Sequence, residues 1–542
     1  MKIREIAEKL FLELGQQDIV AGSREERESL EKIRGIFEEL QLPVETYSFQ
    51  CSSWREKHVS LHLHDHELKA VAMPNSPSGS VEAKAVYVGE RILREEFRGL
   101  DLTGKIAVVK MYRKIDEISW QYLRAVERGA EAVIFVDPYP DRRRRIVIVP
   151  SVDYTFSVGS PPPVPVASVS LLDGLKLFQA ANRGEKISLE IETDADNSAT
   201  TGVVAAGDLE GPIFTAHIDK WLSGFTDNVL GVGIVVALAE KYRENAGFIV
   251  FGSEEFGAPG YSPWYWIWGS RSFVSGLDER DRLSELGLII NFDTLGGQNI
   301  SLSASGVDLL SGLRKILGDS YRYTPDQVIF DSFSFTMHGH PALTIHTFED
   351  TLPIYHTDKD VPGNVDWQKI EEAVQLAEII ATNYMKNKWK MLDYTVLIDK
   401  VKEKAMKLKD IKEASELIDF LKKIKIENEK QAHYIRRELT RPIFAGTYGE
   451  VFEDPVVSYP YLLEAIEDLL ALTQSPMDNT KGESKLKALV KTVPGWETKI
   501  YDLRILVNKN AGEELRYLAR QLATAYLAET RKIFEKVASV AL

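Results

Sequence analysis

The sequence predicts an α/β protein in which a mostly parallel, mixed sheet is flanked by helices. Three observations support this class. Apolar strand-like runs alternate with helical runs between residues 200 and 390. A segment rich in β-branched residues precedes this region, and a region of helical periodicity follows it. Alternating strands and helices are typical of a parallel sheet covered by helices.

The chain opens with helical periodicity. Residues 3–42 are predicted to form two amphipathic helices, separated by AGSREERES, whose serine and glutamates suit a helix start. Residues 51–199 then change to short β-branched runs such as AKAVYVG, KIAVVKMY and AVIFVD, with a single good helix at about 119–128. We expect 51–199 to be a small β-rich domain inserted into the α/β region.

The α/β pattern resumes with GPIFTAHID and continues through GFIVFGSEE, LGLIINFDTLGG and PALTIHTF. The predicted domains are therefore 1–50 with 200–390, which form one discontinuous unit, then 51–199 and 391–542. The last region has helical periodicity throughout, with one face formed by Leu515, Leu518, Leu522 and Tyr526. We expect a helical bundle packed on the rest of the chain or on another subunit; a separate binding module is an alternative without a motif.

Composition restricts the class of protein. With 542 residues, 44% hydrophobic and 27% charged, the chain has the composition of an ordinary soluble globular protein of several domains. The start MKIREIAEKLFLELG lacks the features of a signal peptide, and no apolar run is long enough to span a membrane. Cys51 is the only cysteine, which excludes internal disulfides and cysteine-based metal sites. We expect a cytoplasmic protein that does not bind membranes.

The charge also argues against nucleic acid as a partner. The formal net charge is -15, which repels phosphate backbones. The one basic cluster, DRRRR at 141–145, is followed by the apolar run IVIVP. We predict that this cluster is a solvated loop before a strand; a site for a polyanion or a carboxylate is the alternative.

Acidic residues and histidines recur at the ends of predicted strands, where sites in open parallel sheets gather. They are His217, Asp219, Asp227, Glu254, Glu255, Asp293 and His356. Each alone has an ordinary explanation, such as a helix cap, a carboxylate facing solvent or a hydrogen-bonded histidine. Together they would crowd like charges at one sheet edge unless a cation neutralised them. The sequence therefore predicts a divalent metal held by His, Asp and Glu.

The order of these motifs is specific. HID, FTDNVLGVG, SEEFG, NFDTLGG and YHTDKD follow one another along the chain, and this order resembles the dinuclear zinc aminopeptidase and glutamate carboxypeptidase family. The resemblance covers about residues 3–50 and 200–387 and implies the zinc exopeptidase fold. Segment 51–199 resembles the protease-associated domain that many members carry at this point. The C-terminal helices occupy the place of the dimerisation domain of the transferrin receptor branch.

The resemblance implies two Zn²⁺ per subunit, for which Co²⁺ or Mn²⁺ could substitute. One ion would be held by His217, Asp227 and Asp293. The other would be held by Asp227, Glu255 and His356, so that Asp227 bridges the two. The chemistry agrees, because His, Asp and Glu suit zinc, and two metals roughly 3.5–4 Å apart can share an activated hydroxide.

The resemblance also implies roles for residues beside the metals. Glu254 would be the general base, since its side chain diverges from that of its neighbour Glu255. Asp219 would accept the second ring N–H of His217 and fix its tautomer. Tyr355 is a candidate donor to the developing oxyanion. In the family the peptide bond that follows Asp227 is often cis, and we expect the same here.

Two stretches depart from the family pattern. APGYSPWYWIW intervenes between SEEFG and GSRSF. We predict a loop that buries its aromatics on the sheet edge; the alternative is that Trp264, Tyr265, Trp266 and Trp268 wall a substrate pocket or a partner contact. Ser332 stands where relatives often have a histidine, which concerns substrate contacts and leaves the metal set intact.

The remaining histidines lie outside the family's ligand positions. We expect His338, His340 and His346 to be structural or exposed. The tract HLHDH at 62–66 is explained by alternation along a strand.

The predicted function is a zinc-dependent exopeptidase, with the aminopeptidase form favoured because NFDTLGG resembles that branch more closely. It would hydrolyse N-terminal residues of peptides through a metal-bridging hydroxide, and it would form a homodimer through the C-terminal helices. The alternatives are a carboxypeptidase or dipeptidase, for which Arg271 is an available cation, a single-zinc glutaminyl cyclase, and an inactive receptor-like scaffold. The scaffold would have lost ligands, whereas here all five predicted ligands and Glu254 are present.

Overall fold

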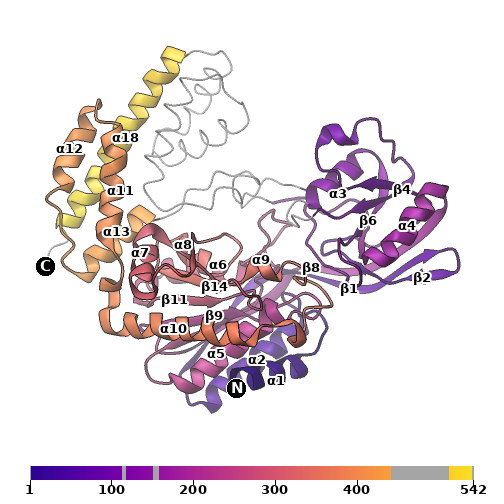
Figure 1. Cartoon of the computed structure of the whole chain (residues 1–542), viewed down its shortest axis with the longest axis horizontal. Helices are drawn as coiled ribbons and strands as arrows, with labels where there is room; N and C mark the ends of the chain where they lie inside the picture. Colours follow the sequence, from indigo (N-terminus) through magenta and orange to yellow (C-terminus); the bar gives the residue numbers. More distant parts are fainter. Residues whose placement is uncertain (1, 113–117, 151–157, 441–511, 540–542) are drawn as a thin grey trace.

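The structure is a computed structural model that describes residues 2–112, 118–150, 158–440 and 512–539 (Figure 1). It confirms the predicted fold class, a mixed and mostly parallel sheet flanked by helices. The strand order in the α/β region is β13-β12-β14-β11-β9-β10-β8. These strands are β8 (Lys186–Gly207), β9 (Ile213–His217), β10 (Gly247–Phe251), β11 (Ile289–Phe292), β12 (Ser301–Ala304), β13 (Arg322–Pro325) and β14 (Ala342–His346).

The central strands are short, apolar and parallel. β9 pairs in parallel with β10 and with β11, and β11 pairs in parallel with β14, whereas β8 and β12 run antiparallel to their central neighbours. Every residue of β9, β10, β11 and β14 is buried, as expected for strands covered on both faces. Their carboxyl ends therefore meet at one edge of the sheet.

Helices cover both faces of the sheet. One face packs against α1 (Lys2–Leu14), α2 (Arg24–Glu39), α5 (Leu230–Lys241) and α10 (Trp367–Asn387), and α6 (Trp268–Asp278) packs on the other. The remaining helices of this region are α7 (Gly306–Leu317), α8 (Ser332–Thr336) and α9 (Phe348–Thr351). The two helices predicted over 3–42 are confirmed as α1 and α2.

Two long strands lead into the inserted domain. β1 (Val44–Leu63) pairs antiparallel with β8 from Val44 opposite Ala206 to His62 opposite Ser188. Beyond them lie β2 (His66–Leu68), β3 (Ala70–Ala72), β4 (Gly79–Gly89), β5 (Lys105–Lys110), β6 (Ala130–Val136) and β7 (Val166–Val169). In Figure 1 this domain lies on the right, on the other side of the α/β region from the C-terminal helices, and β1 and β8 lead into it.

The expectation of a single helix in the inserted domain is wrong. The predicted helix is α3 (Ile118–Glu127), but a second helix, α4 (Leu171–Arg183), follows β7. Ser170 caps α4 by accepting from the N–H of Asp173, and Gly184 ends it with φ +66°. These capping residues stop a β-branched run from continuing as a strand.

The basic cluster at 141–145 is not a solvated loop before a strand. Arg144 and Arg145 are 1% and 3% exposed, and the run 146–149 that follows is buried without joining the sheet. Arg144 pairs with Asp137 and donates to main-chain carbonyls of the α/β region, and Arg145 pairs with Asp18, so burial leaves both arginines paired.

The described C-terminal helices are α11 (Tyr394–Lys407), α12 (Lys412–Leu421), α13 (Glu429–Thr440) and α18 (Gly512–Ser539). Their apolar residues, including Leu397, Leu417, Ile435 and Leu527, join the core of the α/β region. The face predicted from Leu515, Leu518, Leu522 and Tyr526 has side chains that lie outside the described residues. Among the described residues, no helix is both long and apolar enough to cross a membrane.

Candidate metal centre

Two clusters of buried side chains lie at the carboxyl edge of the parallel strands. The first, called the His217 cluster, consists of His217, Asp227 and Asp293; the second, the His356 cluster, consists of Asp227, Glu255 and His356. In each cluster one donor atom from every residue lies within 4.8 Å of the others. Among the described residues only these two groups meet that condition. The structure thus brings together all five residues predicted as metal ligands.

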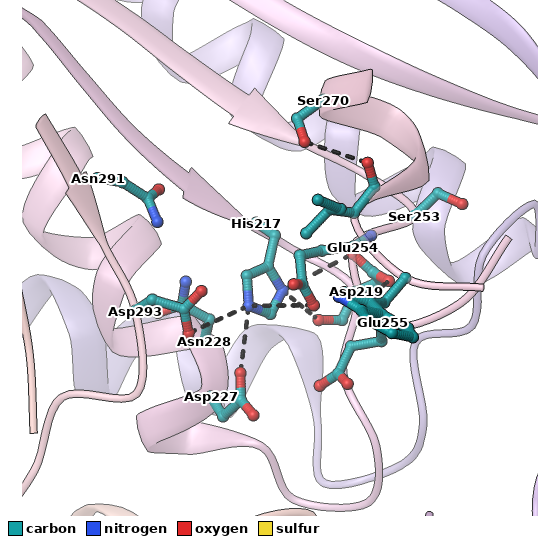
Figure 2. A network of polar contacts seen from close by, with 12 residues as sticks. His217, Asp219, Asp227, Asn228, Ser253, Glu254, Glu255, Ser270, Asn291 and Asp293 are labelled. Atoms are coloured by element: carbon teal, nitrogen blue, oxygen red, sulfur yellow. Dashed lines mark hydrogen bonds and ion pairs between the residues drawn. The ribbon is translucent and has the colours of Figure 1, made fainter. Parts of the chain in front are cut away.

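Each residue owes its place to the end of an element. His217 is the last residue of β9, Glu255 follows β10, and Asp293 follows β11. Asp227 lies in the turn 225–229 before α5, and the peptide bond from Asp227 to Asn228 is cis, as the resemblance implies. Figure 2 shows Asp227, Asp293 and Glu254 converging on the ring of His217.

Asp227 faces both clusters. Its Oδ1 lies 3.1 Å from Nε2 of His217, and its Oδ2 lies 3.2 Å from Nε2 of His356. Nε2 of His217 is also 3.6 Å from Oδ1 of Asp293, and Nε2 of His356 is 2.8 Å from Oε2 of Glu255. A carboxylate with one oxygen toward each histidine has the arrangement of a bridge between two cations.

Burial makes this a costly place for charge. All five residues are at most 6% exposed, and the Nε2 atoms of both histidines and Oε1 of Glu255 have no hydrogen-bond partner. Donor atoms that are buried, convergent and without partners are the arrangement a cation would satisfy. Imidazole nitrogens with carboxylate oxygens and no thiolate fit Zn²⁺ and other divalent first-row ions.

The pKa values show how strongly the site favours added positive charge. Burial, together with neighbouring carboxylates, raises the pKa values of Glu254 and Glu255 well above their ordinary range. Burial raises the pKa of Asp293 to about 6. Although burial disfavours the imidazolium of His217, Glu254 and Asp293 raise its pKa well above the usual value. Protons take up the role that a divalent cation would fill.

Asp219 makes the predicted contact with His217, and it does so through its main chain rather than its carboxylate. Nδ1 of His217 lies 3.0 Å from the main-chain carbonyl oxygen of Asp219, but 3.7 Å from its carboxylate. The carboxylate instead accepts the main-chain N–H groups of Glu254 and Glu255, each at 2.9 Å. Asp219 therefore orients the histidine through its backbone and fixes the turn of the two glutamates through its side chain.

Glu26 is a supporting residue that the sequence analysis missed. It lies on the buried face of α2, and its carboxylate accepts the N–H groups of Gly22 and Ser253 at 2.7 and 2.8 Å. Burial and the nearby Asp219 raise its pKa to about 8. An amphipathic helix with a glutamate on its apolar face was the signal that could have identified it. Together with Asp219, Glu26 holds the backbone of residues 253–255.

The turn before α5 is tied to the strand that carries Asp293. Nδ2 of Asn228 donates to the carbonyl oxygen of Phe292 at 2.8 Å. Asp360, which is fully buried, accepts the N–H of Thr226 at 2.9 Å and that of Asp227 at 3.2 Å. These contacts fix Asp227 between the two clusters.

Tyr355 lies beside the metal centre. Its ring stacks on the ring of His356, with centroids 3.6 Å apart and planes inclined by 19°. Burial and nearby carboxylates raise its pKa well above the usual value, so the phenol keeps its proton. Its donation to an oxyanion stays a prediction.

The aromatic insertion folds inward. Trp264 and Trp266 are 1% and 7% exposed and pack with Val328 and Phe333, and Nε1 of Trp266 donates to the carbonyl oxygen of Val328 at 2.7 Å. Arg271 is buried beneath them and donates to the carbonyl oxygens of Trp264 and Trp266 at 2.8 and 2.7 Å. The insertion therefore buries Trp264 and Trp266, whereas Tyr265 and Trp268 stay partly exposed, and Arg271 is engaged by carbonyls of the loop.

The other singled-out residues have structural contacts. Ser332 is buried and hydrogen-bonds Asp326 and Thr344, each at 2.7 Å. His340 and His346 are buried and hydrogen-bond Gly287 and Ser303, in agreement with a structural role. His338 lies 3.1 Å from Asp278, and the tract at 62–66 forms the end of β1 and the turn into β2.

Comparison with known proteins finds a family match over the residues of this site. Residues 205–380, which contain both clusters, match the model of Peptidase family M28. Aminopeptidase YwaD of Bacillus subtilis (strain 168) is 24% identical over 383 residues, which are 66% of this chain and 79% of that protein. A probable leucine aminopeptidase 2 of Aspergillus oryzae is 26% identical over 265 residues, 47% of this chain; the match spans half of that relative's length.

Solved structures share the fold. BSAP, a zinc aminopeptidase from Bacillus subtilis, superposes with a TM-score of 0.54 at 19% identity, over 72% of this chain and 95% of that one. A peptidase M28 precursor from Shewanella amazonensis SB2B gives 0.55 at 16% identity, over 71% and 93%. With the family match across both clusters, the chain is a metallopeptidase whose residues 205–380 match the model of Peptidase family M28.

Proposed function

We propose that this metallopeptidase is a zinc-dependent aminopeptidase that removes N-terminal residues from peptides. The observation that carries the proposal is the position of Asp227, whose two carboxylate oxygens lie 3.1 and 3.2 Å from histidine nitrogens of different clusters. The names of the similar proteins, an aminopeptidase of Bacillus subtilis and a probable leucine aminopeptidase of Aspergillus oryzae, support the choice of the N-terminal bond.

The proposed division of labour follows the two clusters. His217, Asp227 and Asp293 would hold one zinc ion, and Asp227, Glu255 and His356 the other. Bound zinc supplies a Lewis acid for the scissile carbonyl and lowers the pKa of the attacking water. Glu254 would transfer the proton, and Asp219 would orient Glu254.

Glu254 is the proposed base. Its Oε2 lies 3.9 Å from Nε2 of His217, and it belongs to neither cluster, so its carboxylate can take a proton from the attacking water and deliver it to the leaving amine. Asp219 accepts the main-chain N–H of Glu254 and thereby fixes the backbone from which that carboxylate extends.

The decisive experiment uses one peptide in three forms: free, N-acetylated and C-amidated. The zinc-loaded protein is expected to shorten the free and amidated peptides from the N-terminus and to leave the acetylated one intact, as followed by mass spectrometry. Shortening that only amidation blocks would instead identify a carboxypeptidase. No cleavage of any form would leave a dipeptidase or an inactive scaffold. Arg271 does not favour the carboxypeptidase, since two loop carbonyls already engage it.

Three further features of the proposal concern the whole chain. We infer that residues 51–199 are the counterpart of the protease-associated domain, that the protein is a homodimer through its C-terminal helices, and that it is cytoplasmic. The insertion of a β-rich domain between β1 and β8 supports the first. The second rests on the position of the C-terminal helices, which follow the α/β region as in the transferrin receptor branch. A monomeric mass at micromolar concentration would contradict the dimer, and recovery outside the cytosolic fraction would contradict the location.

A further inference from the structure

The buried arginines of the inserted domain contact the loop that carries His356. Nη1 of Arg144 donates to the carbonyl oxygen of Leu352 at 3.0 Å and also to that of Tyr355, and Nη2 donates to the carbonyl oxygen of Pro353 at 3.0 Å. Nε of Arg144 pairs with the buried Asp137 at 2.8 Å. One guanidinium thus joins the inserted domain to three carbonyls of loop 352–358.

The backbone of the inserted domain also reaches His356 itself. The N–H of Arg145 donates to the carbonyl oxygen of His356 at 3.0 Å, and Nδ1 of His356 lies 3.1 Å from the carbonyl oxygen of Arg145. Arg144 and Thr357 form an isolated antiparallel bridge at the same place. A carbonyl oxygen only accepts hydrogen bonds, so Nδ1 of His356 carries the proton. Its Nε2 then has no proton and keeps a lone pair that can bind a metal ion.

Further contacts hold the same loop. Arg143 pairs with Asp358, with Nε 3.2 Å from Oδ2 and the main-chain N–H 3.1 Å from Oδ1. Leu352 and Tyr355 pack against the apolar core of the inserted domain, which includes Val88 and Ile148. The loop is therefore fixed on one side by the inserted domain through charge, hydrogen bonds and apolar contact.

The two histidines of the metal centre differ in this respect. His217 finds its Nδ1 partner in Asp219, two residues along its own chain segment. His356 finds its partner in Arg145, more than two hundred residues away in the inserted domain. A ligating histidine needs such a partner, because the second ring nitrogen sets its tautomer and orientation. Orientation of the His217 cluster is local, whereas that of the His356 cluster depends on another domain.

We propose that the inserted domain completes the His356 cluster, with Arg144 as the positioning residue that holds loop 352–358 so that Nε2 of His356 faces Asp227 and Glu255. This rests on the proposed metal centre. Arg144 touches neither substrate nor reacting atoms and acts through the loop. Loss of the Arg144 contacts weakens metal binding at the His356 cluster and leaves metal binding at the His217 cluster unchanged.

The test is the substitution Arg144→Lys in the full chain. Lysine keeps the charge opposite Asp137 but cannot donate to three carbonyls and a carboxylate from one planar group. Arg436→Lys is the matched control, because Arg436 is equally buried, pairs with Asp308 at 3.2 Å and donates to the carbonyl oxygen of Ser305, neither of which belongs to a cluster. Arg436→Lys likewise removes a buried guanidinium, but from a contact that does not involve loop 352–358.

The measurement is zinc affinity, by competition with a chromophoric chelator and by metal content after dialysis. Wild type and Arg436→Lys are expected to bind two zinc ions per chain with equal affinities. Arg144→Lys is expected to bind one of the two about 10- to 100-fold more weakly, as substitutions of residues that orient a ligand do. In a His356→Ala background, Arg144→Lys is expected to change nothing further.

Hydrogen exchange of the metal-free protein gives a second readout that does not depend on zinc. The amide of Arg145 is expected to exchange faster in Arg144→Lys and to be unchanged in Arg436→Lys. If Arg144→Lys does not fold, Asp358→Asn, at a half-buried ion pair, is expected to weaken the same single ion by a smaller factor.

Three outcomes overturn the proposal. Two zinc ions bound by Arg144→Lys with wild-type affinity would show that the loop is held without Arg144. An equal loss in Arg436→Lys would reduce the effect to general destabilisation. Failure of the wild type to bind zinc at all would overturn the metal centre and, with it, this inference, whereas the first two outcomes leave the proposed function standing.

Discussion

Asp227 gives one oxygen to each cluster, so neither cluster is complete without it. Although burial opposes its charge, the imidazoles of His217 and His356, whose Nε2 atoms face its two oxygens, lower the pKa of its carboxyl below the ordinary value. The residue is thus held ionised between two imidazoles. Glu254 lies at the edge of the same site without belonging to either cluster. Replacing Asp227 or Glu254 by its amide is therefore expected to have different effects on metal binding.

Asp227→Asn is expected to lose both metal ions, whereas Glu254→Gln is expected to keep both. Removing a general base while retaining the metals should lower kcat by about 10²- to 10⁴-fold. Metal content per chain and initial rates on a free peptide measure the two effects together. Equal loss of metal in both variants would contradict the assignment of Glu254 as the base.

His346 makes a pH-dependent contribution to stability. Burial lowers its pKa to about 3, and its Nδ1 accepts the N–H of Phe348 at 3.3 Å, so the folded protein keeps the ring neutral. Between the ordinary histidine pKa and 3, the unfolded chain binds a proton that the folded chain does not, and stability falls as the pH falls.

The expected penalty from His346 is about 2 kcal/mol at pH 5, with none above the ordinary histidine pKa. His346→Gln removes this contribution, so its free energy of unfolding should fall less than that of the wild type between pH 7.5 and pH 5. Urea unfolding at both pH values gives the comparison, in which other titrating groups cancel. Identical slopes for the two proteins would count against the prediction.

At the scale of single residues, the sequence predicted identities better than contacts. The five candidate ligands were found because strand ends and motif order are visible in the sequence. The contact of Asp219 with His217 was predicted for the residue but not for the atom, since whether a carbonyl or a carboxylate reaches Nδ1 depends on the path of the backbone after β9. Glu26 was missed because its partner Ser253 lies more than two hundred residues away.

Among the elements, the aromatic loop before α6 contributes packing more than surface. Trp266 fills a buried cluster with Trp264 and Phe333 and satisfies its own N–H through Val328. Truncation leaves a cavity and an unpaired carbonyl, both of which cost stability.

Trp266→Ala is expected to destabilise the protein by roughly 3–5 kcal/mol, with KM for short peptides unchanged. Trp266→Phe should lose clearly less, because it keeps most of the ring volume. Denaturant unfolding and steady-state kinetics on peptides with apolar or polar first residues provide the measurement. A raised KM without a loss of stability would assign the loop to the substrate pocket instead.

Helices and strands were predicted where periodicity was clear, as for α1, α2 and α3. The misses lie where local composition and tertiary pairing disagree. The β-branched run at 146–149 is buried but joins no strand, although the N–H of Ile148 donates to the carbonyl oxygen of Pro74 beside the edge strand β3. α4 begins where a serine cap interrupts another such run. The β-propensity of a run depends on its residue types, whereas its pairing in a sheet depends on the tertiary contacts around it.

For the whole molecule, metal and fold should be linked thermodynamically. A ligand that binds only the folded state adds about 4 kcal/mol when present at a thousand times its dissociation constant. Removal of zinc with a chelator is therefore expected to lower the melting temperature, and re-addition should restore it, as measured by calorimetry. Asp227→Asn should melt at the same temperature with and without zinc; a wild type indifferent to the chelator would contradict the metal centre.

Domain limits were the feature of the whole chain least visible in the sequence. The predicted boundaries at 50/51 and 199/200 follow a real change in composition, yet β1 and β8 run through both without a break. Composition changes where the environment of the residues changes, whereas hydrogen-bonded strands continue past that point.

Cys51 and Ala199 are direct neighbours across β1 and β8. A hairpin turn between them would therefore bypass the inserted domain and preserve the strand order of the α/β sheet. Such a shortened chain would still lose Arg145, the only residue that accepts from Nδ1 of His356 among the described contacts. Gain or loss of the domain in the history of such a chain would be simple for the fold but not for the catalyst, which would have to acquire a replacement carbonyl at the same time.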